Sequence, residues 1–409
     1  MKVNRKILKL ACYTVNVTMA LVGNVPPLLF LTFREMYGIS FSMLGLLVVV
    51  NFATQLGIDL VFSFFSEKFN IPKTVRTMPI LTAIGLIIFS LVPTFFPKLA
   101  YAGLAVGTIL CAVSSGLAEV LISPIIASLP ADDPEREMSA LHSVYAWGVV
   151  GVVIFSTLFL LVFGKENWNI LMLIFIILPV LSLILYSMTD ITCVESEEGS
   201  GGLLGIFKNP LLWLSFIAIF LGGASEVTMG QWSSSYLEHA LGIDKVWGDV
   251  FGVAFFGMTL GIGRTLYAKR GKNLTRVILI GAIGASACYI IAVVSSIPVI
   301  GLIACALTGY FTAMMWPGNL SIATERFASG GVVVFALMAA GGDLGASVVP
   351  ELVGVVTDAI IKNPKALELA NALSLTPDSL AMKAGLLIGA LFPIAAIPVY
   401  AALHKKRNS

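Results

Sequence analysis

The sequence predicts an all-α membrane protein with twelve transmembrane helices in two pseudo-symmetric six-helix bundles. Of the 409 residues, 58% are hydrophobic and only 12% are charged, whereas a soluble domain carries about 25% charged residues. Apolar stretches long enough to cross a bilayer, about 20 residues each, recur along the whole chain. Weak sequence similarity between the two halves supports the division into two bundles.

Twelve apolar stretches are the expected transmembrane spans. Residues 1–9 are basic and precede the first stretch, but no small-residue cleavage site follows. We therefore expect the first stretch to be a retained helix and not a signal peptide. Several stretches exceed the required length, which predicts tilted or kinked helices. The twelve spans are residues 8–33, 40–65, 75–96, 99–128, 139–164, 168–189, 209–237, 247–268, 275–297, 299–323, 329–356 and 383–403.

The positions of the basic residues predict the orientation of these spans. With the N-terminus inside, 17 of the 25 Lys and Arg residues fall in cytoplasmic segments, 7 fall outside, and Arg264 lies within a helix. Cytoplasmic loops of membrane proteins carry the excess of Lys and Arg. Both termini are therefore expected in the cytoplasm, and the chain is expected in a cell membrane, such as a bacterial inner membrane.

The predicted domains are an N-terminal bundle (1–189), a cytoplasmic linker (190–208) and a C-terminal bundle (209–409). The linker is acidic and rich in Gly and Ser, which is typical of a hinge between two halves.

A faint internal repeat supports these domains. Leu56-Gly57-Ile58 recurs as Leu260-Gly261-Ile262, and Gly38-Ile39 recurs as Gly242-Ile243. Both pairs are separated by 204 residues, an offset that superposes spans 1 and 2 on spans 7 and 8. Shared offsets of this kind are typical of transporters that are built from repeats.

Composition argues against several other classes of protein. The net charge is only +2, and no Lys/Arg-rich run beside aromatic residues suggests a nucleic-acid partner. The five cysteines are scattered through apolar segments without disulfide or metal-ligand spacing. We expect no metal, no cofactor and no enzymatic activity, because the sequence contains no metal-ligand cluster and no nucleophile–base motif. The serine run 233–235 alone does not make such a motif.

Four carboxylates lie inside the predicted spans: Asp59, Glu119, Glu226 and Asp343. An ionised acid at the centre of a bilayer costs roughly 2.5–3.5 kcal/mol, so such residues are rare and usually functional. Arg264 is the one basic residue at comparable depth. Most of the four acids must therefore be protonated, bound to a cation or open to water, which points to a transporter with a coupling ion.

Three ordered motifs resemble a known family. Span 4 contains Gly116-Leu117-Ala118-Glu119 followed by Ser123-Pro124, span 5 contains Leu141-His142 followed by Tyr145 and Gly148, and span 7 contains Gly223-Ala224-Ser225-Glu226 followed by Gly230-Gln231-Trp232 and Tyr236-Leu237. This set resembles the fucose–galactose–glucose/H⁺ symporter family of the major facilitator superfamily. The resemblance implies proton-coupled sugar transport, with Glu119 at the proton-linked position.

Two departures from the family pattern bear on the mechanism. The resemblance implies a second acid near the middle of span 1, but Pro27 stands at that position here, so any proton coupling must work without that acid. The superfamily signature of loop 2–3 is degraded over residues 63–70, although the order of charges survives as Glu67-Lys68.

Each candidate residue also has a purely structural interpretation. Glu119 could be a structural acid bonded to a neighbouring helix, and Trp232 and Tyr236 could be interface anchors, which we expect for Tyr236. For Asp59 and Arg264, each within about two turns of a cytoplasmic helix end, we expect structural pairing or reach to water. The candidates for proton coupling are Glu119, Asp343 and His142. The candidates for substrate contact are Glu226, Trp232, Gln231, Asn24, Tyr145, Asn51 and Asn319. The structural or gating charges are Asp59, Glu67, Lys68 and Arg264.

The sequence as a whole predicts a monomeric secondary transporter in a lipid bilayer. Its expected substrate is a small neutral hydroxylated solute, such as a monosaccharide, taken up with a proton, and sodium remains an alternative coupling ion. An exporter of drug-like or amphipathic compounds would fit the many Phe and Met residues and the missing acid in span 1. A non-transporting receptor on the same scaffold is a remote alternative, because we expect no appended signalling domain.

Overall fold

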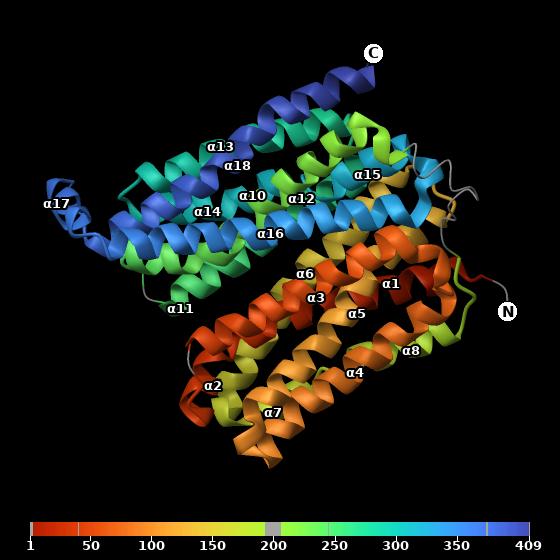
Figure 1. The fold of residues 1–409 in the computed structure, drawn as a ribbon, viewed down its shortest axis with the longest axis horizontal. Coiled ribbons are helices and arrows are strands. Elements are labelled where there is room, and N and C mark those ends of the chain that lie inside the picture. The colour runs from red at the N-terminus through yellow and green to blue at the C-terminus, as the bar shows by residue number, and fades with distance from the viewer. Residues whose placement is uncertain (1–2, 40, 193–205, 244, 374, 409) are drawn as a thin grey trace. The chain divides into compact units, whose positions relative to one another are not determined.

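All regular elements in the described part of the chain are helices (Figure 1). This computed structural model describes residues 3–39, 41–192, 206–243, 245–373 and 375–408. The helices are α1 (Arg5–Leu28), α2 (Phe30–Tyr37), α3 (Phe41–Phe65), η1 (Ser66–Lys68), α4 (Ile71–Phe95), η2 (Pro97–Leu99), α5 (Ala100–Ser128), α6 (Pro134–Phe163), η3 (Lys165–Asn167), α7 (Trp168–Ile174), α8 (Ile177–Ser187), α10 (Pro210–Leu241), α11 (Lys245–Gly248), η4 (Asp249–Ala254), α12 (Phe255–Arg270), α13 (Leu274–Val294), α14 (Pro298–Thr312), α15 (Pro317–Arg326), η5 (Ala328–Gly330), α16 (Gly331–Ile361), α17 (Pro364–Ala372) and α18 (Pro377–Asn408).

Each of the twelve predicted spans coincides with one helix or with consecutive helices, which confirms the fold class. Ten helical segments of the described residues are long and apolar enough to cross a membrane, and a shorter apolar segment, Leu46–Phe62, lies in α3. The predicted eighth span corresponds to the π-helical turn η4 and to α12. Single π-helical turns occur frequently at functional sites.

The chain divides into two compact units. The first unit comprises Met1–Gly202 and Phe327–Ala340, and the second comprises Leu203–Arg326 and Gly341–Ser409. Most of the predicted linker lies outside the described residues. The sequence assigned Phe327–Ala340 to the C-terminal bundle, whereas in the structure this segment groups with the first unit. The α16 residues of this segment are apolar on every side of the helix and buried throughout, as expected for a helix segment surrounded by protein.

The repeat glycines have the same conformation in both halves. Gly38 ends α2 with φ 65° and Gly242 ends α10 with φ 67°. Their N–H groups donate to the carbonyl oxygens of Arg34 and Glu238, each at 3.0 Å. Glycine adopts this left-handed conformation without steric cost, which explains its use as a helix cap. The equivalence of these two caps supports the repeat that the sequence indicates.

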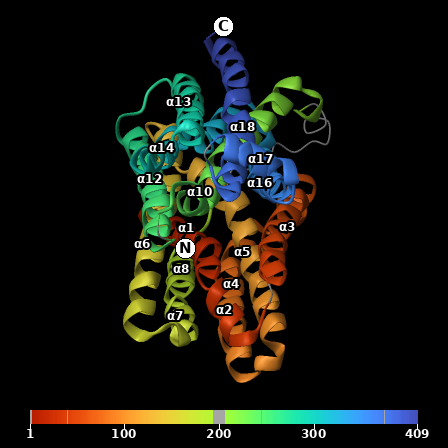
Figure 2. The same ribbon diagram turned by 90° about the vertical axis from the view of Figure 1, so that its left-hand side faces the viewer.

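In the first unit, α1 lies along α6 and α4 lies along α5 (Figure 1, Figure 2). Lys9 and Glu137 form an ion pair near the start of both α1 and α6. Further along, the amide nitrogen of Asn16 donates to the carbonyl oxygen of Leu141 at 2.7 Å. A side chain at Gly148 would press against α1, so glycine lets the two helices approach closely.

In the second unit, the glycines beside Asp343 bring α16 against α10. A methyl group on Gly345 would overlap the carbonyl oxygen of Phe220 and would lie 3.0 Å from the backbone nitrogen of Ala224. Gly223 on α10 meets the carbonyl oxygen of Gly342 in the same way. These glycines therefore allow α16 to pack closely against α10, which corresponds to the predicted span 7.

Gly345→Ala is expected to destabilise the protein by about 1–3 kcal/mol, because the atoms in the way are backbone and cannot rotate aside. The matched control is Gly57→Ala, because nothing lies within 4 Å of the added methyl group there. Thermal unfolding of the purified variants measures the difference. Equal melting temperatures for both variants would contradict the close approach of α10 and α16.

Candidate functional site

A buried ion pair joins α10 to α12 in the second unit. The Nη2 atom of Arg264 lies 2.7 Å from Oε1 and 2.8 Å from Oε2 of Glu226. Arg264 is 2% exposed and Glu226 is 8% exposed. A hydrogen-bonded partner of opposite charge offsets much of the cost of burying either group. The sequence singled out both residues but did not predict that they meet.

The guanidinium of Arg264 also binds the end of α14. Its Nε atom donates to the carbonyl oxygen of Ala313, which follows the last residue of α14, at 2.9 Å. Carbonyl groups at a helix C-terminus carry partial negative charge and attract cations. Arg264 on α12 therefore connects this helix to α10 through a carboxylate and to the end of α14 through a backbone carbonyl.

For Arg264 and Asp59 the sequence predicts structural pairing or reach to water, and the structure shows no exposure to water for either residue beyond 2%. Arg264 is buried, and Asp59 on α3 is 0% exposed. Counting turns to the nearest helix end measures depth along one helix and does not show which helices surround the residue. For Arg264 the structure instead shows the structural pairing that was the other expectation, and the carboxylate of Glu226 draws the side chain inward.

Asn319 holds three helices together. Its Nδ2 atom lies 3.1 Å from the carbonyl oxygen of Ala218 on α10, 2.6 Å from that of Met315 and 2.9 Å from the hydroxyl oxygen of Tyr400 on α18. The Tyr400 hydroxyl donates to the same Ala218 oxygen at 3.0 Å. Asn319 is 1% exposed. This arrangement favours a structural role over the predicted substrate contact, and Tyr400 is a buried polar residue that the sequence reasoning missed.

Three neighbouring side chains on α10 have different surroundings. Gln231 is exposed and Trp232 is partly buried, with its indole N–H donated to the carbonyl oxygen of Pro350 at 3.0 Å. Tyr236 is completely buried and donates to the carbonyl oxygen of Ala292 on α13. The expectation of Tyr236 as an interface anchor is therefore wrong, because this hydroxyl is bonded inside the bundle.

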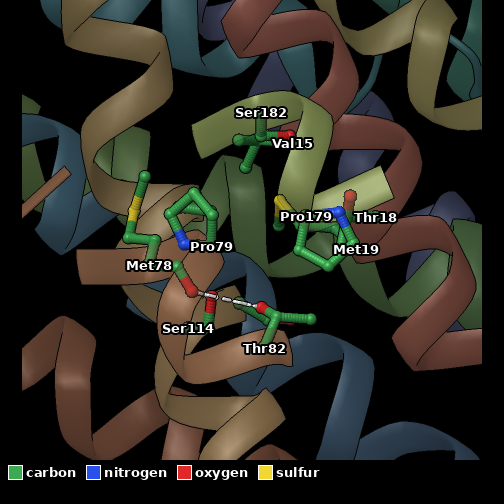
Figure 3. A pocket seen from close by; sticks show the side chains of 11 residues that line it. Val15, Thr18, Met19, Met78, Pro79, Thr82, Ser114, Pro179 and Ser182 are labelled. Atoms are coloured by element: carbon green, nitrogen blue, oxygen red, sulfur yellow. Dashed lines mark hydrogen bonds between the residues drawn. The ribbon is translucent and has the colours of Figure 1, made fainter. Parts of the chain in front are cut away.

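Glu119 is partly buried on α5, a helix that contributes to the lining of a small hydroxyl-lined cavity in the first unit (Figure 3). Its neighbour Ala118 lines the cavity together with residues of α1, α4 and α8. The Thr82 hydroxyl donates to the Ser114 hydroxyl, which donates to the carbonyl oxygen of Met78, each at 2.7 Å. The cavity holds about 10 Å³, enough for about one water molecule. It is therefore too small for a sugar.

On α1 and α6, two predicted substrate residues lie close together. The amide nitrogen of Asn24 donates to the carbonyl oxygen of Ala20 at 2.8 Å. The hydroxyl oxygen of Tyr145 on α6 lies 3.8 Å from the position that a β-carbon on the adjacent Gly23 would occupy. His142 is partly buried one turn before Tyr145. The structure thus brings Asn24, Tyr145 and His142 into one region of the first unit.

The remaining candidates lie apart from these groups. Asn51 is partly buried on α3, and Asp343 is 5% exposed among the glycines of α16. Glu67 and Lys68 are exposed on η1, and the Lys68 ammonium lies 4.8 Å from the centre of the Phe65 ring. Their exposure is compatible with charges on a loop outside the membrane.

These features define the class of the protein. Two units of membrane-length helices share a repeat and bury polar and charged side chains, an architecture of integral membrane transporters. The Major Facilitator Superfamily model matches residues 11–350, and the chain belongs to this family. The predicted superfamily is therefore confirmed. No curated protein matches the sequence.

Solved structures of sugar symporters share the fold. The crystal structure of the major facilitator transporter FucP in the outward conformation has a TM-score of 0.70 at 14% identity, covering 95% of this chain and 98% of that one. A second FucP structure, described as the E. coli fucose:proton symporter, has a TM-score of 0.67 at 14% identity, covering 95% and 98%. The proton:xylose symporter XylE, bound to 6-bromo-6-deoxy-D-glucose, has a TM-score of 0.68 at 14% identity, covering 96% and 95%. At this identity the likeness shows the fold alone.

Proposed function

We propose that this protein is a secondary active transporter that takes up a small neutral hydroxylated solute, such as a monosaccharide, together with a proton. The observation that carries the proposal is the buried Glu226–Arg264 pair. Because the two charges cancel, the pair contributes no net charge, and a neutral solute is then favoured over an ionic one. The named sugar and proton substrates of FucP and XylE support the same choice.

In this proposal, Glu119 binds and releases the coupling proton, and Asp343 and His142 are secondary candidates. Asn24, Tyr145, Asn51 and Gln231 offer neutral hydrogen-bonding groups to solute hydroxyls. The ring of Trp232 offers an aromatic face to the apolar side of a sugar. The protein would act as a monomer in a bacterial inner membrane with both termini in the cytoplasm, its two halves giving alternating access.

Uptake into proteoliposomes tests this proposal. A pH gradient, acidic outside, should drive accumulation of at least one radiolabelled sugar among D-glucose, D-xylose and L-fucose, and the external medium should become more alkaline on sugar addition. A sodium gradient at constant pH is the control for the coupling ion. Proton-driven efflux of amphipathic dyes without sugar uptake would overturn the proposal in favour of an exporter.

A further inference from the structure

Two consecutive prolines in α1 deprive one carbonyl group of its helical donors. A carbonyl oxygen in a helix accepts from the N–H group four residues later, or three residues later in a tighter turn. For Gly23 these positions are Pro27 and Pro26, and proline has no N–H group. The next N–H, that of Leu28, is the regular donor to the carbonyl of Asn24. The oxygen of Gly23 therefore has no regular partner within its own helix.

Gly23 lies at an exposed position within a membrane-length segment. Gly23 is exposed, its neighbour Val22 is buried and its neighbour Asn24 is partly buried. Gly23 lies inside the candidate span Arg5–Pro26. Backbone groups without helical partners occur at membrane depth only where protein or a water-filled path satisfies them. The exposed face of Gly23 is therefore expected to line a water-filled path and not to face lipid.

The groups around Gly23 suit a hydroxyl ligand. Glycine has no side chain to cover its own carbonyl, and the nearest neighbour to its missing β-carbon is the hydroxyl oxygen of Tyr145, at 3.8 Å. The Asn24 amide nitrogen is directed back to Ala20, which leaves its oxygen as a further acceptor. A carbonyl and an amide oxygen accept from O–H donors and repel carboxylates, so the chemistry favours a neutral polyol or sugar.

We infer that the backbone carbonyl oxygen of Gly23 accepts a hydrogen bond from one hydroxyl of the transported solute, with the Tyr145 hydroxyl beside it. This inference rests on the proposed function and adds a specificity-determining atom to it. Pro26 and Pro27 serve to keep that oxygen available. A solute that lacks the matching hydroxyl loses this bond.

The test restores the missing donor. Pro27→Ala places an N–H four residues after Gly23, which binds the Gly23 oxygen and withdraws it from the solute. The matched control, Pro26→Ala, also removes one proline, but its new N–H is the regular donor to the carbonyl oxygen of Val22, so the oxygen of Gly23 stays without the regular donor four residues later. Calorimetric titration of the purified proteins with D-glucose, D-xylose and L-fucose, and with monodeoxy analogues of whichever sugar binds, gives Kd for each pair.

Pro27→Ala is expected to raise Kd by about three- to tenfold, the value of one neutral hydrogen bond, and Pro26→Ala to leave it unchanged. One monodeoxy analogue should bind the wild type and Pro27→Ala equally. Should Pro27→Ala fail to fold, Pro27→Gly supplies the same N–H under the same criteria. Equal sugar binding by wild type and Pro27→Ala would overturn the inference while the proposed function stands. If the wild type binds none of the sugars, the proposed function fails and the inference with it.

Discussion

Arg264→Gln is expected to destabilise the protein by about 3–5 kcal/mol, because it leaves the carboxylate of Glu226 buried without its cation. The variant also loses the bond from Arg264 to the carbonyl oxygen of Ala313 at the end of α14. The expected result is a large fall in the melting temperature of the purified protein in detergent. Glu226→Gln should lower the stability by a comparable amount, because it leaves the guanidinium of Arg264 buried without its anion.

The double variant Glu226→Gln/Arg264→Gln separates loss of charge pairing from loss of packing. Two neutral amides carry no unpaired charge, so the double variant should be more stable than either single variant. Arg270→Gln is the matched control, because Arg270 is exposed at the end of the same helix, and its effect should stay within about 0.5 kcal/mol. Losses that simply add in the double variant would show that the two residues are not coupled.

The fold followed from the sequence because hydropathy is a local property. A span is defined by about 20 consecutive apolar residues, so each of the twelve could be located without knowledge of its neighbours. The glycines beside Asp343 are also visible in the sequence, and small residues in a span favour close helix contacts such as the one between α10 and α16. The structure adds to the two short sequence matches of the repeat, because Gly38 and Gly242 end their helices in the same left-handed conformation.

The partners of the polar side chains could not be predicted in the same way. Glu226 and Arg264 lie 38 residues apart on different helices, and neither hydropathy nor spacing indicates which helices are neighbours. Tyr236 illustrates the same limit: its position near a span end suggested an interface anchor, whereas a carbonyl oxygen on α13 accepts its hydroxyl inside the bundle. The spacing of residues along the sequence shows which face of a helix a side chain lies on, but it does not show which neighbouring helix or group that side chain contacts.

The pairing of Glu226 with Arg264 also bears on which acid carries the coupling proton. The sequence presented four intramembrane acids and one cation, and any of the acids could have carried the proton. Since Arg264 already binds the Glu226 carboxylate, proton coupling through Glu226 would require that ion pair to break. Glu119, which combines a family-like motif with partial burial on α5, becomes the first candidate.

Glu119→Gln is expected to abolish proton-driven accumulation of the solute while preserving exchange across the membrane. Glutamine has the size of the protonated acid but cannot release a proton, so it mimics one state of a proton carrier permanently. In proteoliposomes with an imposed pH gradient, the internal solute concentration should rise only to the external one. Counterflow, in which labelled solute exchanges for unlabelled solute without a gradient, should continue.

Glu35→Gln is the matched control for this variant. Glu35 is an exposed acid of the same unit whose ion pair with Lys165 lies at the surface, where such pairs contribute about 0–1 kcal/mol. Its removal should change neither accumulation nor counterflow. Normal accumulation by Glu119→Gln would rule out Glu119 as the proton carrier and shift the assignment to Asp343, the other acid of the predicted coupling set. Loss of both accumulation and counterflow would instead mark Glu119 as a group required for solute binding or for movement between the two states.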